Sequence, residues 1–328
     1  MTLVEPSSTY EDLEALVDRF FRERFTTDNP VITEAIKRML AAGGKRLRPR
    51  ITLLAAAACG GEPLEHLHLA AYMELIHVAT LIHDDVVDNA QTRRGVNATA
   101  VDYGNRVSVL AGDYLFAWIF KNVTFKYPHP VPHVLSATLA DICDGEVLQL
   151  QALGNLDLPL DTYVEIARKK TASLFAASAR CGAIMGGGAS LQIEALREFG
   201  ENLGIAFQMR DDLLDVTADE RSLGKPVGND LVERKTTLPL IAALAEGNGS
   251  FRSLVDGYYA GGTAEAIPSI VYGIEREGGV RATRTQIARY VELAKKALEP
   301  IGPSAAKKDL TQLTDALLDE GRKGLEQT

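Results

Sequence analysis

Two acidic motifs carry the residue types best suited to metal chemistry: the first pentad, Asp84-Asp85-Val86-Val87-Asp88, and the second pentad, Asp211-Asp212-Leu213-Leu214-Asp215. In a helix the first and fifth positions of a pentad lie about 40° apart, so both carboxylates project from one face. Six carboxylates brought together would repel one another unless cations neutralised them. Oxygen ligands without His or Cys favour Mg²⁺, which adds water and substrate phosphates to its coordination. One pentad alone would indicate a solvated acidic helix end, but two copies after apolar stretches favour a magnesium site for a diphosphate.

A basic segment, Gly43-Gly44-Lys45-Arg46-Leu47-Arg48-Pro49, offers the complementary charge. The glycines predict a flexible turn, and the proline suits the first turn of a helix that we expect to begin near Ile51. Lysine supplies a point charge and arginine a planar fork, so together they could hold a diphosphate without metal. A solvated basic turn is an equally good interpretation of this segment alone.

Further polar residues recur close to the two pentads. Arg93 and Arg94 follow the first pentad after a short loop, where a structural salt bridge to the pentad is the alternative to a role in binding. The other candidates are Lys169-Lys170-Thr171 before an apolar stretch, Lys225 and Lys235 after the second pentad, His77 seven residues before Asp84, and Gln208 three residues before Asp211. Each alone could be a solvated lysine, a core histidine or a backbone-bonded glutamine.

The elements that must position these residues are helices. Ala, Leu and Glu dominate long stretches, and we find no convincing strand. Helix breaks are predicted at 42–44, 60–63, 127–130, 154–155, 186–188, 223–226 and 247–249. Without a linker, a low-complexity tract or a repeat, we expect one all-α domain over residues 1–328, with a loosely packed N-terminal segment.

Charge and cysteine usage narrow the class of protein. A net charge of -9 argues against general nucleic-acid binding, which requires a basic face. Cys59, Cys143 and Cys181 are widely spaced and form no CxxC pair, so we expect neither a disulfide framework nor a zinc site, and a cytoplasmic location. The apolar stretch 172–191 contains Arg180 and four glycines, which favours a buried core helix over a membrane span.

Together, GGKRLRP, ELIHVATLIHDDVVD, RRG, KKTA, FQMRDDLLD and GKP followed by KTTLPL resemble, in that order, the trans-isoprenyl diphosphate synthase family over roughly residues 40 to 245. The resemblance implies one all-α bundle around a deep central cavity, usually a homodimer. It also implies that isopentenyl diphosphate is joined head to tail to an allylic diphosphate after ionisation, with transient membrane contact for release of the product.

The same resemblance implies a role for each matching residue. Asp84, Asp88 and Asp211 would bind Mg²⁺, three ions with substrate present, and Asp85, Asp212 and Asp215 would support them. Arg93, Lys170, Lys225 and Lys235 would hold the allylic diphosphate, with Thr171 and Gln208 near the reacting carbons. Gly44, Lys45, Arg48, His77 and Arg94 would hold isopentenyl diphosphate. The chain departs from the family at Glu233-Arg234, where many relatives have a glycine before the lysine, and its C-terminus lacks the basic cluster of some short-chain relatives, so a C-terminal lid is not expected.

Product length is expected to depend on the turn before Asp84. In the resembling family large aromatic residues there accompany short products, whereas this chain has Ala79 and Thr80. We therefore expect a heptaprenyl to nonaprenyl product, unless a deeper residue such as Leu135 or Leu139 closes the tunnel. The alternatives are a shorter-chain geranylgeranyl or farnesyl synthase, a class I terpene cyclase, a non-catalytic subunit of a heteromeric synthase and, last, a helical calcium or scaffold protein.

Overall fold

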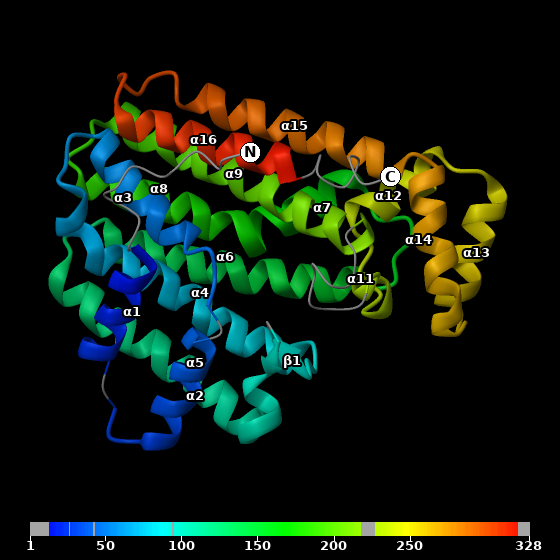
Figure 1. The fold of residues 1–328 in the computed structure, drawn as a ribbon, viewed down its shortest axis with the longest axis horizontal. Coiled ribbons are helices and arrows are strands. Elements are labelled where there is room, and N and C mark those ends of the chain that lie inside the picture. The colour runs from blue at the N-terminus through cyan, green and yellow to red at the C-terminus, as the bar shows by residue number, and fades with distance from the viewer. Residues whose placement is uncertain (1–12, 26, 42, 94, 218–226, 321–328) are drawn as a thin grey trace. The chain divides into compact units, whose positions relative to one another are not determined.

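The computed structural model describes residues 13–25, 27–41, 43–93, 95–217 and 227–320, and these are helical nearly throughout (Figure 1). The all-α class is therefore confirmed. Six helices end where a break was predicted: α2 (Pro30–Ala41), α3 (Leu47–Ala58), α5 (Thr99–Lys126), α6 (Val131–Ala152), α8 (Ser173–Met185) and α12 (Leu238–Glu246).

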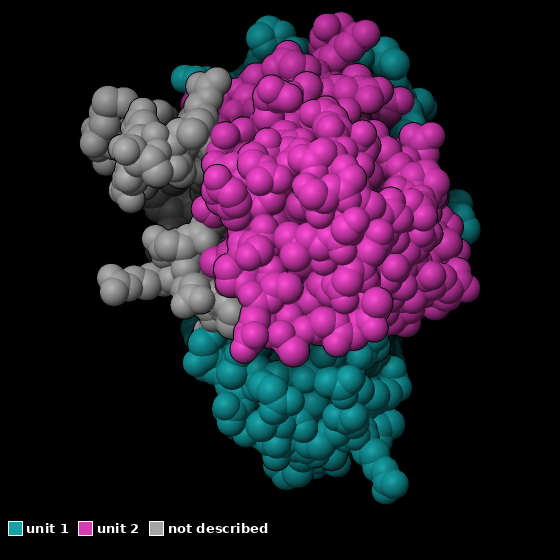
Figure 2. Space-filling model, turned by 90° about the vertical axis from the view of Figure 1, so that its right-hand side faces the viewer, with its two compact units in different colours: residues 1–137, 177–197, 300–310 teal, residues 138–176, 198–299, 311–328 magenta. Residues whose placement is uncertain are grey.

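The chain groups into two compact units, which Figure 2 colours separately. Unit 1 comprises residues 1–137, 177–197 and 300–310, and unit 2 comprises residues 138–176, 198–299 and 311–328. The one-domain interpretation of residues 1–328 stays a prediction. Residues 1–12, where the N-terminal segment that was expected to pack loosely begins, lie outside the described residues.

Unit 1 is built around α4 (Leu67–Val87), which packs against α3 and α5. From Leu69 to Ile76 every residue of α4 is buried, and Glu74 is the one charged residue among them. A helix that is apolar on all sides is stable only when it is surrounded by other elements. The remaining elements of unit 1 are α1 (Leu13–Arg24), α2, the 3₁₀ turn η2 (Pro63–His66) and a small hairpin.

Within the apolar stretch 172–191, residues 173–185 form a helix that is mostly buried, which agrees with the predicted core helix. This helix is α8, and no described helix is both long and apolar enough to cross a membrane. Within unit 1, the backbone of α8 lies directly on α3: a Cβ atom at Gly182 would stand 2.2 Å from the carbonyl oxygen of Thr52. Glycine is therefore needed there for close approach of the two backbones.

The expectation that the chain has no strand was wrong at one place. Strands β1 (Thr92–Arg93) and β2 (Val96–Asn97) form a two-residue antiparallel ladder that pairs Arg93 with Val96. Gly95 lies in the connecting turn with a φ of 80°, a conformation that glycine adopts at little cost. Alternation over two residues is too short a pattern to predict a strand.

Unit 2 packs α12 against α14 (Ile267–Arg276) and α15 (Gly279–Ala297). Its other complete elements are α7 (Leu160–Ala167), the π-helical turn η3 (Arg168–Ala172), α11 (Asn229–Val232), α13 (Gly249–Tyr259) and the 3₁₀ turn η4 (Ala264–Ala266). Four helices contribute residues to both units: α6, α8, α9 (Ser190–Thr217) and α16 (Ala305–Glu320).

Candidate active site

The first pentad lies at the C-terminal end of α4, in unit 1. Asp84 belongs to the last turn, and Asp88 caps the helix by donating its backbone N–H to the Asp84 carbonyl oxygen at 2.8 Å. Both side chains are half-buried, at the point where the buried helix reaches the surface. The predicted spacing of one turn between the two carboxylates is therefore present.

Asp85 differs from its two neighbours because its side chain is fully buried. Arg93 of β1 holds it, with Nε 2.7 Å and Nη2 2.6 Å from Asp85 Oδ1. Burial raises the pKa of Asp85, against the opposing effect of the Arg93 guanidinium. The salt bridge weighed for Arg93 from the sequence is thus formed, and Arg94 lies outside the described residues.

The basic segment leads directly into α3, which begins at Leu47. The predicted start near Ile51 was too late, because Pro49 is compatible with any position in a first helical turn. Arg46 has a φ of 46° and is almost fully buried, with Nη1 2.9 Å from Glu74 Oε1 and Nη2 3.0 Å from Asp18 Oδ1. This ion-pair network ties the basic segment to α4.

Three residues beside Arg46 were expected to bind isopentenyl diphosphate. Lys45 is exposed, Gly44 is half-buried, and Arg48 is half-buried in the first turn of α3. The N-terminus of a helix attracts anions, because its first N–H groups and its dipole present positive charge. His77 is half-buried in α4, and its carbonyl oxygen accepts a hydrogen bond from Thr80 Oγ1 at 2.8 Å.

The second pentad lies near the end of α9, in unit 2. The Asp211 side chain is 44% exposed, whereas Asp215 is fully buried. Asp215 holds the chain that follows α9: its Oδ2 accepts the backbone N–H of Asp230 at 3.0 Å, and its carbonyl oxygen accepts that of Gly228 at 2.8 Å. Asp215 thus anchors Gly228 and Asp230.

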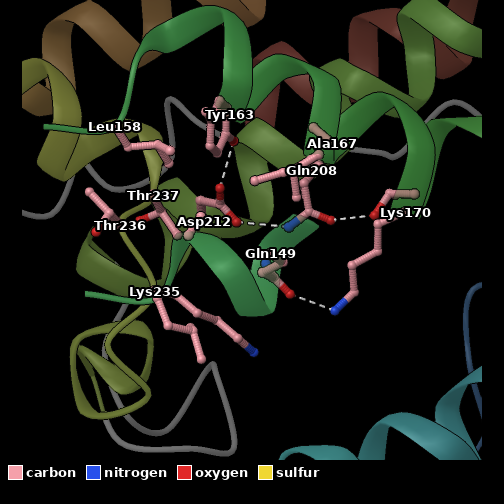
Figure 3. A pocket seen from close by; sticks show the side chains of 14 residues that line it. Gln149, Leu158, Tyr163, Ala167, Lys170, Gln208, Asp212, Lys235, Thr236 and Thr237 are labelled. Atoms are coloured by element: carbon pink, nitrogen blue, oxygen red, sulfur yellow. Dashed lines mark hydrogen bonds between the residues drawn. The ribbon is translucent and has the colours of Figure 1, made fainter. Parts of the chain in front are cut away.

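A chain of hydrogen bonds ends on Asp212 (Figure 3). Thr171 Oγ1 donates to Gln208 Oε1 at 2.7 Å, and Gln208 Nε2 donates to Asp212 Oδ1 at 2.8 Å. The hydroxyl of Tyr163, from α7, donates to Asp212 Oδ2 at 2.6 Å. Both carboxylate oxygens of Asp212 therefore have a protein donor, which fixes the orientation of the carboxylate.

The electrostatics of Asp212 reflect this enclosure. Burial raises the pKa of Asp212 to about 6, and the carboxylates of Asp211 and Asp215 act in the same direction. The hydrogen bonds from Tyr163 and Gln208 oppose that increase. A cation bound beside Asp212 would favour its ionised form.

A small cavity of about 30 Å³, enough for one or two water molecules, lies beside this chain of hydrogen bonds (Figure 3). Lys170 and Lys235 line it from different segments. Lys170 Nζ donates to Gln149 Oε1 at 2.7 Å and forms an ion pair with Glu146, and Lys235 Nζ lies 2.5 Å from Glu233 Oε2. Its full lining is Gln149, Ala152, Leu153, Leu158, Tyr163, Ile166, Ala167, Lys170, Thr171, Gln208, Asp212, Lys235, Thr236 and Thr237. Lys225 lies outside the described residues.

The turn that carries Lys170 and Thr171 is π-helical: the N–H of Ser173 bonds to the carbonyl oxygen of Arg168, five residues earlier. Such wide turns are rare and are frequent at functional sites. The structure thus brings five sequence-predicted residues together within unit 2: Lys170, Thr171, Gln208, Asp212 and Lys235.

Sequence reasoning missed Tyr163, Gln149, Glu146 and Asp230. No motif surrounds Tyr163, and 49 residues separate it from Asp212. Glu146 and Gln149 lie three residues apart on α6, a spacing that places both on one helix face and offered a weak signal.

The pentads fit a hard divalent cation. Asp84, Asp88 and Asp211 are partly exposed, while Asp85, Asp212 and Asp215 are buried and accept hydrogen bonds from protein groups. Among the described residues no three His, Cys, Asp or Glu side chains form a complete ligand set. Mg²⁺ does not need one, because water and substrate phosphates complete its octahedron.

The fold and these groups define the class of all-α polyprenyl synthases. A crystal structure of a polyprenyl synthase from Caulobacter crescentus, complexed with calcium and isoprenyl diphosphate, superposes with a TM-score of 0.90 at 37% identity. The match covers 94% of this chain and 95% of that one. Residues 29–271 match the family model described as Polyprenyl synthetase, and the chain belongs to that family.

Curated relatives of similar length differ in the products that their names state. A short chain isoprenyl diphosphate synthase of Methanothermobacter thermautotrophicus is 36% identical, over 93% of this chain and 95% of its own length. An all-trans-nonaprenyl-diphosphate synthase of Rhodobacter capsulatus is 37% identical, over 93% and 94%. The resemblance seen in the sequence motifs is confirmed at the level of the family.

Proposed function

We propose that this protein is a magnesium-dependent trans-prenyltransferase that joins isopentenyl diphosphate to an allylic diphosphate and releases a medium- or long-chain polyprenyl diphosphate. The observation that carries the proposal is that the six pentad carboxylates differ in exposure. Three carboxylates are exposed enough to meet a metal–diphosphate complex, and three are held by the protein. A helical scaffold protein would not require that difference.

Each group then has a part in the reaction. Asp84, Asp88 and Asp211 would hold Mg²⁺, which as a Lewis acid stabilises the negative charge of a departing diphosphate. Arg93, Lys170, Lys225 and Lys235 would bind the allylic diphosphate, and Gly44, Lys45, Arg48, His77 and Arg94 would bind isopentenyl diphosphate.

Positioned cations lower the barrier to breaking the allylic carbon–oxygen bond, since they stabilise the charge that develops on the leaving group. The electron pair of the isopentenyl double bond then forms the new carbon–carbon bond. Loss of a proton, with the released diphosphate as the acceptor, restores a double bond. No side-chain nucleophile is required.

The deciding experiment incubates the purified protein with Mg²⁺, isopentenyl diphosphate and farnesyl diphosphate and sizes the products by chromatography. We expect elongated all-trans prenyl diphosphates of heptaprenyl to nonaprenyl length, and no elongation with EDTA. Cyclic hydrocarbons would favour a terpene cyclase. Elongation only after a cellular partner is added would favour the subunit of a heteromeric synthase.

Small side chains before the first pentad support the longer product. Ala79 is fully buried in α4 and Thr80 is half-buried. Neither side chain is aromatic, so neither adds aromatic bulk to that turn. Of the deeper candidates for a tunnel floor, Leu135 is fully buried and Leu139 is half-buried. The named relatives include short- and long-chain synthases, so product size is the informative measurement.

We also propose a homodimer, and an apolar surface on α5 supports it. Val101, Val109, Leu110 and Phe125 of that helix are exposed, Leu110 by 60% and Phe125 by 89%. A contiguous exposed apolar patch is typical of a surface that binds a partner, and Val109 and Leu110 are adjacent on α5. We propose a cytoplasmic location, because the three free thiols fit a reducing compartment. We also propose that the protein contacts the membrane transiently when the product leaves.

A further inference from the structure

Arg234, directly before Lys235, has a left-handed backbone conformation, with a φ of 58°. A glycine would adopt it freely, whereas a residue with a Cβ atom meets steric resistance. This conformation thus falls within Glu233-Arg234, where the chain is expected to depart from the family. An arginine keeps such a conformation only where surrounding contacts hold it.

Those contacts come from two other segments of unit 2. Arg234 Nη1 donates to the carbonyl oxygen of Tyr259 at 2.7 Å, and its guanidinium carbon lies 5.8 Å from the centre of the Tyr259 ring. The Arg234 carbonyl oxygen accepts the N–H of Gly154 at 2.9 Å. The side chain is therefore tied to the end of α13, and the main chain to the turn after α6.

Lys235 is held from its other side by the second pentad. Its backbone N–H donates to the Asp230 carbonyl oxygen at 2.8 Å, and the N–H of Asp230 donates to Asp215 Oδ2 at 3.0 Å. The Lys235 side chain is 15% exposed and lines the same cavity as Asp212 (Figure 3). The direction of Lys235 thus depends on the backbone anchors at Asp215 and Arg234 and on the ion pair of its Nζ with Glu233.

We propose that Arg234 is a positioning residue: its attachment to Tyr259 holds the left-handed turn that directs Lys235 toward a diphosphate bound beside the second pentad. This rests on the proposed function of Lys235. A glycine would adopt the left-handed turn because its backbone is unrestricted. Arg234 adopts the same turn because its side chain is bound to Tyr259.

The test compares Arg234→Ala, Arg234→Gly and the wild type, with inorganic diphosphate and Mg²⁺ as the probe in calorimetric titrations. Arg234→Ala loses the anchor and keeps the steric cost, so its Kd should increase about tenfold, the value of one charge-assisted hydrogen bond. Arg234→Gly also loses the anchor but has no steric cost, so its Kd should increase by only about threefold. Arg281→Ala is the matched control, because Arg281 is an exposed arginine of unit 2 that forms a salt bridge with Glu246, and neither residue lines the cavity.

Steady-state kinetics and thermal unfolding separate positioning from damage to the fold. We expect KM for the allylic diphosphate to rise in Arg234→Ala while KM for isopentenyl diphosphate and the melting temperature stay near wild type. An unchanged Kd in Arg234→Ala, a Kd raised as much in Arg234→Gly as in Arg234→Ala, or equal losses for both substrates would overturn the proposal. Failure of the proposed function would look different, because the wild type itself would then neither bind diphosphate nor elongate a primer.

Discussion

The second aspartates of the two pentads share one property. Each is buried and accepts a hydrogen bond from a protein group. Arg93 holds Asp85 with a guanidinium, and Tyr163 holds Asp212 with a hydroxyl. These two carboxylates are therefore fixed before any ligand binds. Their rigidity orients the helix ends from which Asp84, Asp88 and Asp211 project, an advantage because a preorganised site loses less entropy on binding.

Tyr163→Phe should weaken the second pentad without disturbing packing, because only the hydroxyl is lost. Removing this buried hydrogen bond should lower the free energy of unfolding by about 1 kcal/mol. Asp212 then loses one of its two donors, so diphosphate binding with Mg²⁺ should weaken as well. Urea denaturation and calorimetric titration measure the two effects. Tyr272→Phe, at a side chain that is 65% exposed, is the control, and an equal effect there would contradict the assignment.

Ala79→Phe should shorten the product, since it places aromatic bulk one turn before Asp84. Ala79 is fully buried, so overpacking should also cost about 1–3 kcal/mol of stability. Chromatography of the products reports the length, and a melting curve shows whether the variant is folded. If the folded variant makes products of unchanged length, the size of the side chain at position 79 does not control product length.

At the scale of single residues, the sequence predicted which residue types form the site. It did not predict which of them are buried and hold the structure and which are exposed to ligand. Lys45, Arg46 and Arg48 look alike in a basic segment, yet Arg46 is buried between two carboxylates. Its partners, Asp18 and Glu74, lie 28 residues away on either side, a separation that no local pattern reveals.

At the scale of elements, the contact between α3 and α8 depends on the absence of side chains. Gly182→Ala would place a Cβ atom 2.2 Å from a backbone oxygen that cannot rotate away. We expect a loss of about 3 kcal/mol, the upper range for overpacking, measured by urea denaturation. Gly257→Ala is the control, because nothing lies within 4 Å of a Cβ atom there and alanine favours helix α13. Equal effects of the two changes would refute the close contact.

The junction of α1 and α4 should respond to acid through His68, whose ring lies 4.7 Å from that of Phe20. Burial lowers the pKa of His68 below 6.5, and Lys126 and Arg24 lower it further. The unfolded state therefore binds more protons below about pH 6.5, and the free energy of unfolding should fall as the pH decreases. His68→Phe should reduce that acid sensitivity between about pH 8 and about pH 5.5, as urea midpoints would show. A variant as acid-sensitive as the wild type would exclude this residue.

Six helix ends were predicted from glycine and proline in the sequence, because those residues act locally. The π-helical turn at Arg168–Ala172 was not, since RKKTA has ordinary helical propensities. Its wider hydrogen bonding depends on packing that the local sequence does not encode.

At the scale of the whole molecule, the exposed apolar residues of α5 are the strongest sign of assembly. Leu110→Glu should place a charge in the proposed dimer interface and convert the dimer to monomer, as sedimentation equilibrium would show. Leu191→Glu, at a side chain that is 68% exposed on α9, should leave the dimer intact. A wild type that sediments as a monomer would contradict the homodimer.

The interleaved composition of the two units has a consequence for synthesis on the ribosome. Unit 1 takes in residues 300–310, and unit 2 takes in residues that follow them. A nascent chain therefore has neither unit complete until residues 300–310 have been synthesised. Helix α12, which packs against the later helix α15, must wait with part of its packing surface uncovered, a state in which chains are prone to aggregate. Slow translation of residues 279–320 would lengthen that wait, so the yield of folded enzyme depends on how quickly α15 and α16 are synthesised.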